Sequence, residues 1–150
     1  HNRVEIFTTL LFDFVKRPNV VVAGIYPLKE AILHNHTNIV KILVNHGKID
    51  CSINNNEPLY FACSLSRIEI VKLLLTNDKV NPSDCDNRCL RVAFNNANYA
   101  IIKLILNDPR TKVDDFNEFF QMNKDKKEDM MNIDNFIATM NSEKVYVINK

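Results

Sequence analysis

A pattern with a period of 31 residues is the feature of this sequence that most restricts its fold. Residues 57–62 read EPLYFA and residues 68–75 read IEIVKLLL, and related stretches stand 31 residues before and after them. The residues that keep this spacing are Leu28, Leu59 and Leu90; Ala31, Ala62 and Ala93; and Lys41, Lys72 and Lys103. A fixed period of this size is typical of stacked repeats. The chain is therefore expected to build one continuous core from units that contact their neighbours.

Each unit predicts a short helix, a tight turn and a longer helix. Pro27 and Pro58 stand at the start of the short helix, where a missing N–H costs nothing, and Cys89 takes this place in the third unit. The residues expected to face the core are Leu28, Ala31, Ile32, Ile39, Val40, Ile42 and Leu43; Leu59, Ala62, Cys63, Ile70, Val71, Leu73 and Leu74; and Leu90, Ala93, Phe94, Ile101, Ile102, Leu104 and Ile105. The segments 50–56 and 81–87 carry turn residues, and the register assigns the same structure to 19–25. All three segments are predicted to be extended turns.

These motifs resemble the ankyrin repeat. The stretch Pro58 to Ala62 stands where that family has Thr-Pro-Leu-His-x-Ala, and Glu69 to Leu75 is similar to its second-helix signature. The resemblance covers about residues 3–115 and implies an all-α solenoid of stacked helix-turn-helix units with short finger turns. The degenerate repeats also resemble those of large DNA viruses.

The chain departs from the family pattern in three ways. Its period of 31 residues is shorter than the family's roughly 33, which predicts stunted finger tips. The turn glycines of the family are replaced by Asn35, Ser66 and Ala97, and its first-helix histidine is replaced by Lys29, Tyr60 and Arg91. The chain has 21 asparagines and only two glycines. Because asparagine tolerates the left-handed backbone conformation, it can stand in the turns where glycine is usual.

The register divides the chain into an N-terminal half repeat, three repeats and a C-terminal cap. The predicted boundaries are 1–18 for the half repeat, 19–49, 50–80 and 81–114 for the three ankyrin repeats, and 115–150 for the capping segment. Residues 3–17 have the apolar spacing of one helix, which Pro18 ends. After Leu106 the register is expected to break, because the segment Asn107 to Asp114 is two residues longer than its counterparts.

Composition argues against several classes of function. The net charge of +1 lacks the basic surplus that nucleic acid or an anionic membrane surface requires. No apolar run reaches the ~18 residues of a membrane span, and no signal peptide is recognised. The four cysteines form no CxxC pair, so they are expected to be reduced thiols of a cytoplasmic or nuclear protein. The chain is interpreted as a monomer or as part of a longer chain.

No motif indicates catalysis, a cofactor or a metal. Neither GxSxG nor HExxH occurs, and two glycines cannot form a phosphate-binding loop. A zinc site from Cys85, Cys89 and a histidine has an unusual spacing, and the alternative set His34, His36 and His46 lacks a supporting carboxylate. The chain is therefore predicted not to be an enzyme and to hold no cofactor or metal.

The resemblance implies a module that binds a protein partner through finger tips and first helices. The family's recognition positions fall on Tyr26, Leu33, His34, Glu57, Ser64, Leu65, Arg88, Asn95 and Asn96, with Ile25, Asn56 and Asn87 beside them at the finger tips, and Tyr60 is added as a contact residue. Tyr26, Leu33, Tyr60 and Leu65 would be the apolar anchors, which usually carry most of the binding energy. An alternative is a structural spacer or self-assembly segment of a larger ankyrin array, motivated by the apolar stretches 10–15 and 145–148.

Overall fold

The computed structural model describes residues 25–47 and 49–112 of the 150-residue chain. In these ranges the chain forms six helices and no strand: α3 (Ile25–Leu33), α4 (Thr37–Asn45), α5 (Ile53–Ser64), α6 (Ile68–Leu75), α7 (Asp84–Asn95) and α8 (Tyr99–Asn107). The chain divides into two compact units, 1–112 and 113–150, of which the second lies outside the described residues. So do the expected N-terminal helix over 3–17 and the expected cap over 115–150.

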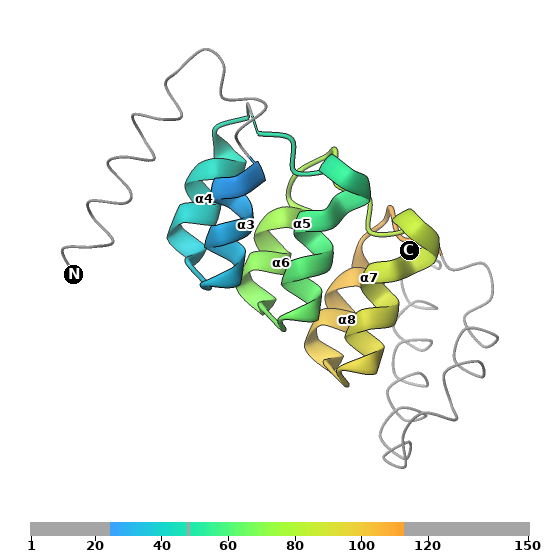
Figure 1. Ribbon diagram of the computed structural model, residues 1–150. Helices are drawn as coiled ribbons and strands as arrows, with labels where there is room; N and C mark the ends of the chain where they lie inside the picture. The colour runs from blue at the N-terminus through green and yellow to red at the C-terminus, as the bar shows by residue number, and fades with distance from the viewer. Residues whose placement is uncertain (1–24, 48, 113–150) are drawn as a thin grey trace. The chain divides into compact units, whose positions relative to one another are not determined.

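The six helices form three helical hairpins that stack side by side (Figure 1). The first helices α3, α5 and α7 are neighbours in one layer, and the second helices α4, α6 and α8 are neighbours in the other. Each helix also packs against its partner in the same hairpin. The predicted all-α solenoid of stacked helix-turn-helix units is confirmed.

The core lies between the two layers and between successive hairpins. The fully buried large side chains are Leu28, Ile32, Ile39, Val40, Leu43, Leu59, Ile70, Leu74, Leu90, Ile101, Ile102 and Ile105. Ala31, Ala62 and Ala93 are also fully buried, and their small side chains allow the helices to approach closely. The expected core residues Ile42, Leu73 and Leu104 are only half-buried, because they lie at the edge of the buried stripe of each second helix.

The turn between the two helices of each hairpin has the same hydrogen bonds in all three repeats. In the first repeat, the His36 N–H donates to the Ala31 carbonyl over 2.7 Å, and the Asn35 N–H donates to the Ile32 carbonyl over 3.1 Å. This pair of bonds is the Schellman motif, which places one residue in the left-handed conformation. That residue has φ of 56° at Asn35, 57° at Ser66 and 49° at Ala97. Asn35, Ser66 and Ala97 therefore adopt the left-handed conformation that glycine has at these positions in the family.

The finger turns differ from the extended turns expected over 50–56 and 81–87. Three consecutive residues are left-handed in each, Asn54–Asn56 with φ of 53°, 58° and 60°, and Cys85–Asn87 with φ of 52°, 56° and 55°. Each turn is closed by a backbone hydrogen bond, from the Asn56 N–H to the Ser52 carbonyl in one and from the Asn87 N–H to the Ser83 carbonyl in the other. Right-handed helix follows, so Pro58 stands in its first turn, where its missing N–H is harmless.

The register continues farther than the expected break after Leu106. The Thr111 N–H donates to the Asp108 carbonyl over 3.0 Å, and 31 residues earlier the Val80 N–H donates to the Asn77 carbonyl over 3.1 Å. The backbone therefore keeps the register of the preceding repeat through Thr111. The two extra residues expected before the end of this segment, at 113 and 114, lie outside the described residues.

Candidate functional site

Within residues 25–47 and 49–112, no other helix covers the outer side of the first helices, and we call this side the first-helix face. Leu28, Leu59 and Leu90 anchor α3, α5 and α7 in the core, so the residues on the opposite side of each helix point outward. Tyr26 on α3 is the most exposed large apolar residue of the described chain, with an exposed fraction of 72%. Leu65, after the end of α5, has an exposed fraction of 36%.

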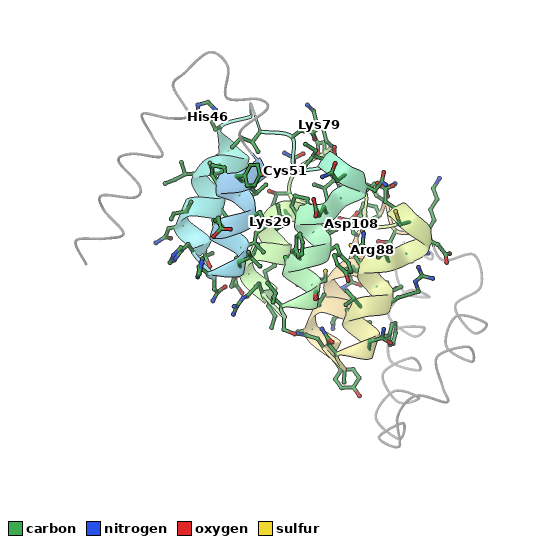
Figure 2. All side chains as sticks on the ribbon, in the orientation of Figure 1. Lys29, His46, Cys51, Lys79, Arg88 and Asp108 are labelled. Atoms are coloured by element: carbon green, nitrogen blue, oxygen red, sulfur yellow. The ribbon has the colours of Figure 1, made fainter. Side chains whose placement is uncertain are left out.

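A row of stacked side chains crosses this face from α3 to α7. The Lys29 ammonium lies 4.7 Å from the centre of the Phe61 ring, and the Arg88 guanidinium lies 3.5 Å from the centre of the Tyr60 ring. The two rings are 5.9 Å apart and tilted by 55°. Figure 2 shows Lys29 and Arg88 on the two sides of α5. We call these four residues the ring–cation row.

The row is a partly preorganised surface. Lys29, Tyr60, Phe61 and Arg88 are all half-buried, so neighbouring side chains restrict each of them. A cation over an aromatic face is held by the negative charge density of the ring, with a strength of about 0.5–1 kcal/mol at exposed sites. Side chains that are already ordered lose less conformational entropy when a partner binds.

The acidic residues of the first-helix face have local partners. Glu30 lies 3.5 Å from His34, and Asp86 forms a 2.8 Å ion pair with Arg91. Glu57 accepts a 2.9 Å hydrogen bond from the side chain of Asn54. In contrast, neither Lys29 nor Arg88 has a carboxylate partner within residues 25–47 and 49–112.

Several of the predicted contact residues at the turn end of the face are used to join the repeats. The Arg67 guanidinium donates to the Leu33 carbonyl over 3.2 Å, and the Asn96 amide donates to the Ser64 carbonyl over 2.9 Å. Each bond links the end of a first helix to the following repeat. The Asn96 side chain is therefore engaged within the stack, whereas Leu65 remains exposed.

The histidine turn lies at the same end of the stack. His34 is exposed, and its ring stacks on His36 with a separation of 5.9 Å between ring centres. His46 follows α4 at the other end of that helix, so the three histidines do not converge (Figure 2). Among the described residues, no group of three or more His, Cys, Asp or Glu side chains could hold a metal ion.

The finger residue Asn56 is not a surface contact. It has an exposed fraction of 1%, its side-chain oxygen accepts from the Asn81 N–H over 2.9 Å, and its amide donates to the Asp84 carboxylate. The expectation that Asn56 presents itself to a partner at a finger tip is therefore wrong. Its counterpart Asn87 donates to the Lys112 carbonyl over 3.0 Å, while its side-chain oxygen is buried without a partner in the described chain.

The remaining predicted residues lie on the first-helix face but do not form one cluster. Tyr60 and Arg88 stack on each other, Tyr26 stands exposed near the start of α3, and Glu57 is half-buried at the start of right-handed α5. Asn95 is exposed at the end of α7. Two members of the ring–cation row, Lys29 and Phe61, were absent from the predicted set. The spacing carried a signal for them, because residues 31 apart lie side by side and Lys29 shares its register position with Tyr60.

The four cysteines differ in their exposure to solvent. Cys51, Cys63 and Cys89 are buried, and Cys85 is exposed on the left-handed turn before α7. A hydrogen bond to Cys89, together with burial, raises the pKa of the Cys63 thiol well above its ordinary value. Burial raises the pKa of Cys51 to about 11. Cys85 and Cys89 thus lie in different surroundings, and Cys89 contacts the thiol of Cys63 on α5.

Comparison with known proteins identifies the repeats. The profile of the family described as "Ankyrin repeats (3 copies)" matches residues 1–86. The hairpin of α7 and α8 lies mostly beyond this match and repeats the same turn hydrogen bonds. No curated protein and no solved structure matches the chain. No helix in the described part of the chain is long and apolar enough to cross a membrane.

Proposed function

The chain belongs to the ankyrin-repeat family, and from this premise we propose that it is a protein-binding module whose contact surface is the first-helix face. Repeats of this family are in general protein–protein interaction modules and are typically non-enzymatic. A stack of such repeats presents an extended surface that a partner can follow across several units.

The observation that carries the proposal is the concentration of aromatic and apolar side chains on one face. Tyr26 is largely exposed, Leu65 is partly exposed, and the adjacent rings of Tyr60 and Phe61 on α5 are half-buried. Aromatic residues and arginine are enriched in the parts of interfaces that dominate binding energy. The proposed contacts are Tyr26, Leu33, His34, Glu57, Tyr60, Ser64, Leu65, Arg88, Asn95 and Asn96, with Lys29 and Phe61 added.

An intracellular location is part of this proposal. The four cysteines form no disulfide, and three of them are buried in the stack as free thiols. Free thiols of this kind suit a reducing compartment such as the cytoplasm or nucleus. The resemblance to repeats of large DNA viruses stays a prediction, which no comparison tests.

Affinity capture tests the proposed surface. The chain serves as bait in a eukaryotic cell lysate beside a Tyr26→Glu, Leu65→Glu variant, and the captured proteins are identified by mass spectrometry. Both substitutions place a charge at an exposed apolar position, so the fold should survive, which a thermal unfolding curve checks. Lys41→Glu on α4 is the matched control, because Lys41 is exposed in the other helix layer.

A protein captured by the parent and the control but lost from the double variant would support the proposal. Capture of the same proteins by all three baits would contradict it. The alternative of a spacer or self-assembly segment rests on residues 10–15 and 145–148, which lie outside the described part of the chain. Light scattering at high concentration tests it, because a monomer would argue against self-assembly.

A further inference from the structure

The ring–cation row carries positive charge that the described part of the stack does not neutralise. Asp86 forms an ion pair with Arg91, Glu30 lies 3.5 Å from the His34 imidazole, and Glu57 accepts a hydrogen bond from Asn54. Within the described ranges, Lys29 and Arg88 contact aromatic rings instead of carboxylates. A ring orients a cation but neutralises no charge. The row therefore has two oriented cations available to a partner.

The orientation of Arg88 leaves its best donors available. A guanidinium is planar, and all five of its N–H groups point outward within that plane. Tyr60 covers a face of this plane at 3.5 Å, which leaves the edges for hydrogen bonding. A carboxylate binds such an edge through two parallel hydrogen bonds, and this geometry makes arginine the preferred partner of carboxylates.

The spacing of the two cations restricts the shape of the partner. Lys29 lies on α3 and Arg88 on α7, with α5 between them. The Lys29–Phe61, Phe61–Tyr60 and Tyr60–Arg88 contacts of 4.7, 5.9 and 3.5 Å limit the distance between the two cations to about 14 Å. An extended peptide advances by about 3.3 Å per residue, so two carboxylates up to about four residues apart would span the row. Between them the peptide would cross the Tyr60 and Phe61 rings.

We propose that the ring–cation row binds an extended acidic peptide segment of a protein partner, with one carboxylate at Lys29, one at Arg88 and an apolar side chain on the Tyr60–Phe61 rings. This inference rests on the proposed protein-binding function and specifies the chemistry of the partner. A nucleic acid fits the face less well, because it carries a phosphate at every nucleotide and the row offers only two cations.

Selection from a displayed library of random twelve-residue peptides tests this chemistry. The bait is the complete chain at low salt, and the readout is the composition of the enriched peptides. We expect enrichment of two acidic residues about four positions apart with an apolar residue between them. A selected peptide should bind at least tenfold more weakly to the Lys29→Glu, Arg88→Glu variant, because like charges then face each other.

Two further baits separate charge from folding. The Lys29→Gln, Arg88→Gln variant removes both charges but keeps polar side chains, and it should also lose the acidic peptides. Lys41→Glu removes the same charge from the other helix layer and should bind them as the parent does. The charge-reversed bait should itself enrich basic peptides.

Each result decides a different point. Enrichment of peptides without acidic residues, or equal binding by the charge-reversed variant, would overturn the acidic partner and leave protein binding intact. Enrichment of no peptide, together with failure of the lysate capture, would overturn both proposals. Binding of a fluorescent single-stranded oligonucleotide more tightly than the selected peptides would overturn the acidic peptide in favour of a nucleic acid.

Discussion

Asp108 and Arg110 form an ion pair that ties the third repeat to the second. The Arg110 guanidinium donates to both oxygens of the Asp108 carboxylate, over 2.8 Å from Nε and 2.6 Å from Nη2. The same guanidinium donates to the Leu75 carbonyl over 2.6 Å and to the Asn77 carbonyl over 2.8 Å. These carbonyls lie at the C-terminal end of α6, where a positive charge is favourable. Arg110 therefore acts as a C-terminal cap for a helix in the preceding repeat.

Removing this cap should destabilise the stack. We expect Arg110→Ala to lower the free energy of unfolding by about 1–3 kcal/mol, because it leaves two carbonyls and a carboxylate without their donor. The Asp108 side chain has an exposed fraction of only 8%, so water replaces the lost bonds poorly. Lys79→Ala is the matched control, since Lys79 occupies the same register position and is exposed. Urea unfolding measures both, and equal losses would contradict the capping role.

The Asp108–Arg110 ion pair predicts that the free energy of unfolding depends on pH. The hydrogen bonds from Arg110 hold the pKa of Asp108 below its ordinary value of 3.8. A carboxyl with a lowered pKa in the folded state contributes its stability above the unfolded pKa and loses it as the pH falls through the folded pKa. The stability difference between the parent and Asp108→Asn should therefore be constant above about pH 5 and shrink below pH 4. A constant difference down to pH 2 would argue against the pair.

The buried finger asparagine offers a comparison between two related positions. Asn56→Ala should lower the free energy of unfolding by about 2–3 kcal/mol, because it removes bonds to the Asn81 N–H and the Asp84 carboxylate. Asn87→Ala should cost only about 1 kcal/mol, since Asn87 makes one such bond, to the Lys112 carbonyl. Both residues have φ near 60°, so the backbone strain of alanine is similar at the two positions. A larger loss at Asn87 would contradict this assignment.

The Schellman turns predict a substitution that stabilises the chain. Ala97 has φ of 49°, a conformation that glycine adopts without the steric cost of a Cβ atom. We expect Ala97→Gly to raise the free energy of unfolding by about 0.5–1 kcal/mol. The relief of backbone strain in the folded state should exceed the opposing effect of glycine, which increases the conformational entropy of the unfolded chain. Gly47→Ala is the reverse test. Its φ is 70° and no atom lies within 4 Å of an added Cβ, so any loss there measures backbone strain alone.

The thiols should differ sharply in reactivity. The thiolate is the reactive species. Cys51 and Cys63 are both buried, and the pKa values of their thiols are raised, so less thiolate is present. At pH 8 the native chain should react rapidly with one equivalent of a maleimide, at Cys85, and with four after unfolding in denaturant. Peptide mapping by mass spectrometry locates the label. Rapid labelling of Cys63 or Cys89 in the native chain would show that the α5–α7 interface opens readily.

The stacked architecture could be predicted because it depends on local pattern and simple periodicity. Leu59, Ala62 and Ile70 were assigned to the core from spacing alone and are fully buried. The left-handed finger turns could not be predicted in the same way, because Asn56 is held by Asn81 and Asp84 from the following repeat. Asparagine and aspartate suit many turn types, so their presence does not select this one.

The candidate site was predicted less completely for a similar reason. The sequence identified Tyr60 and Arg88 as contact residues, and the structure stacks them at 3.5 Å. Lys29 and Phe61 join them only through packing between adjacent helices. The 31-residue spacing indicates which helices are neighbours, but only the structure shows which of their side chains are in contact. The internal use of Asn96 likewise depends on its bond to the Ser64 carbonyl in the preceding repeat.

The left-handed finger turns have a consequence for the chirality of the chain. Three successive L-residues there adopt the mirror image of an ordinary helical turn, a conformation that costs a typical L-residue roughly 1–2 kcal/mol and asparagine less. A D-amino acid has the opposite preference and would adopt the same backbone without that cost. The exposed Asn55, with φ of 58°, is therefore a position where a chemically synthesised chain would accept D-asparagine more readily than the natural enantiomer.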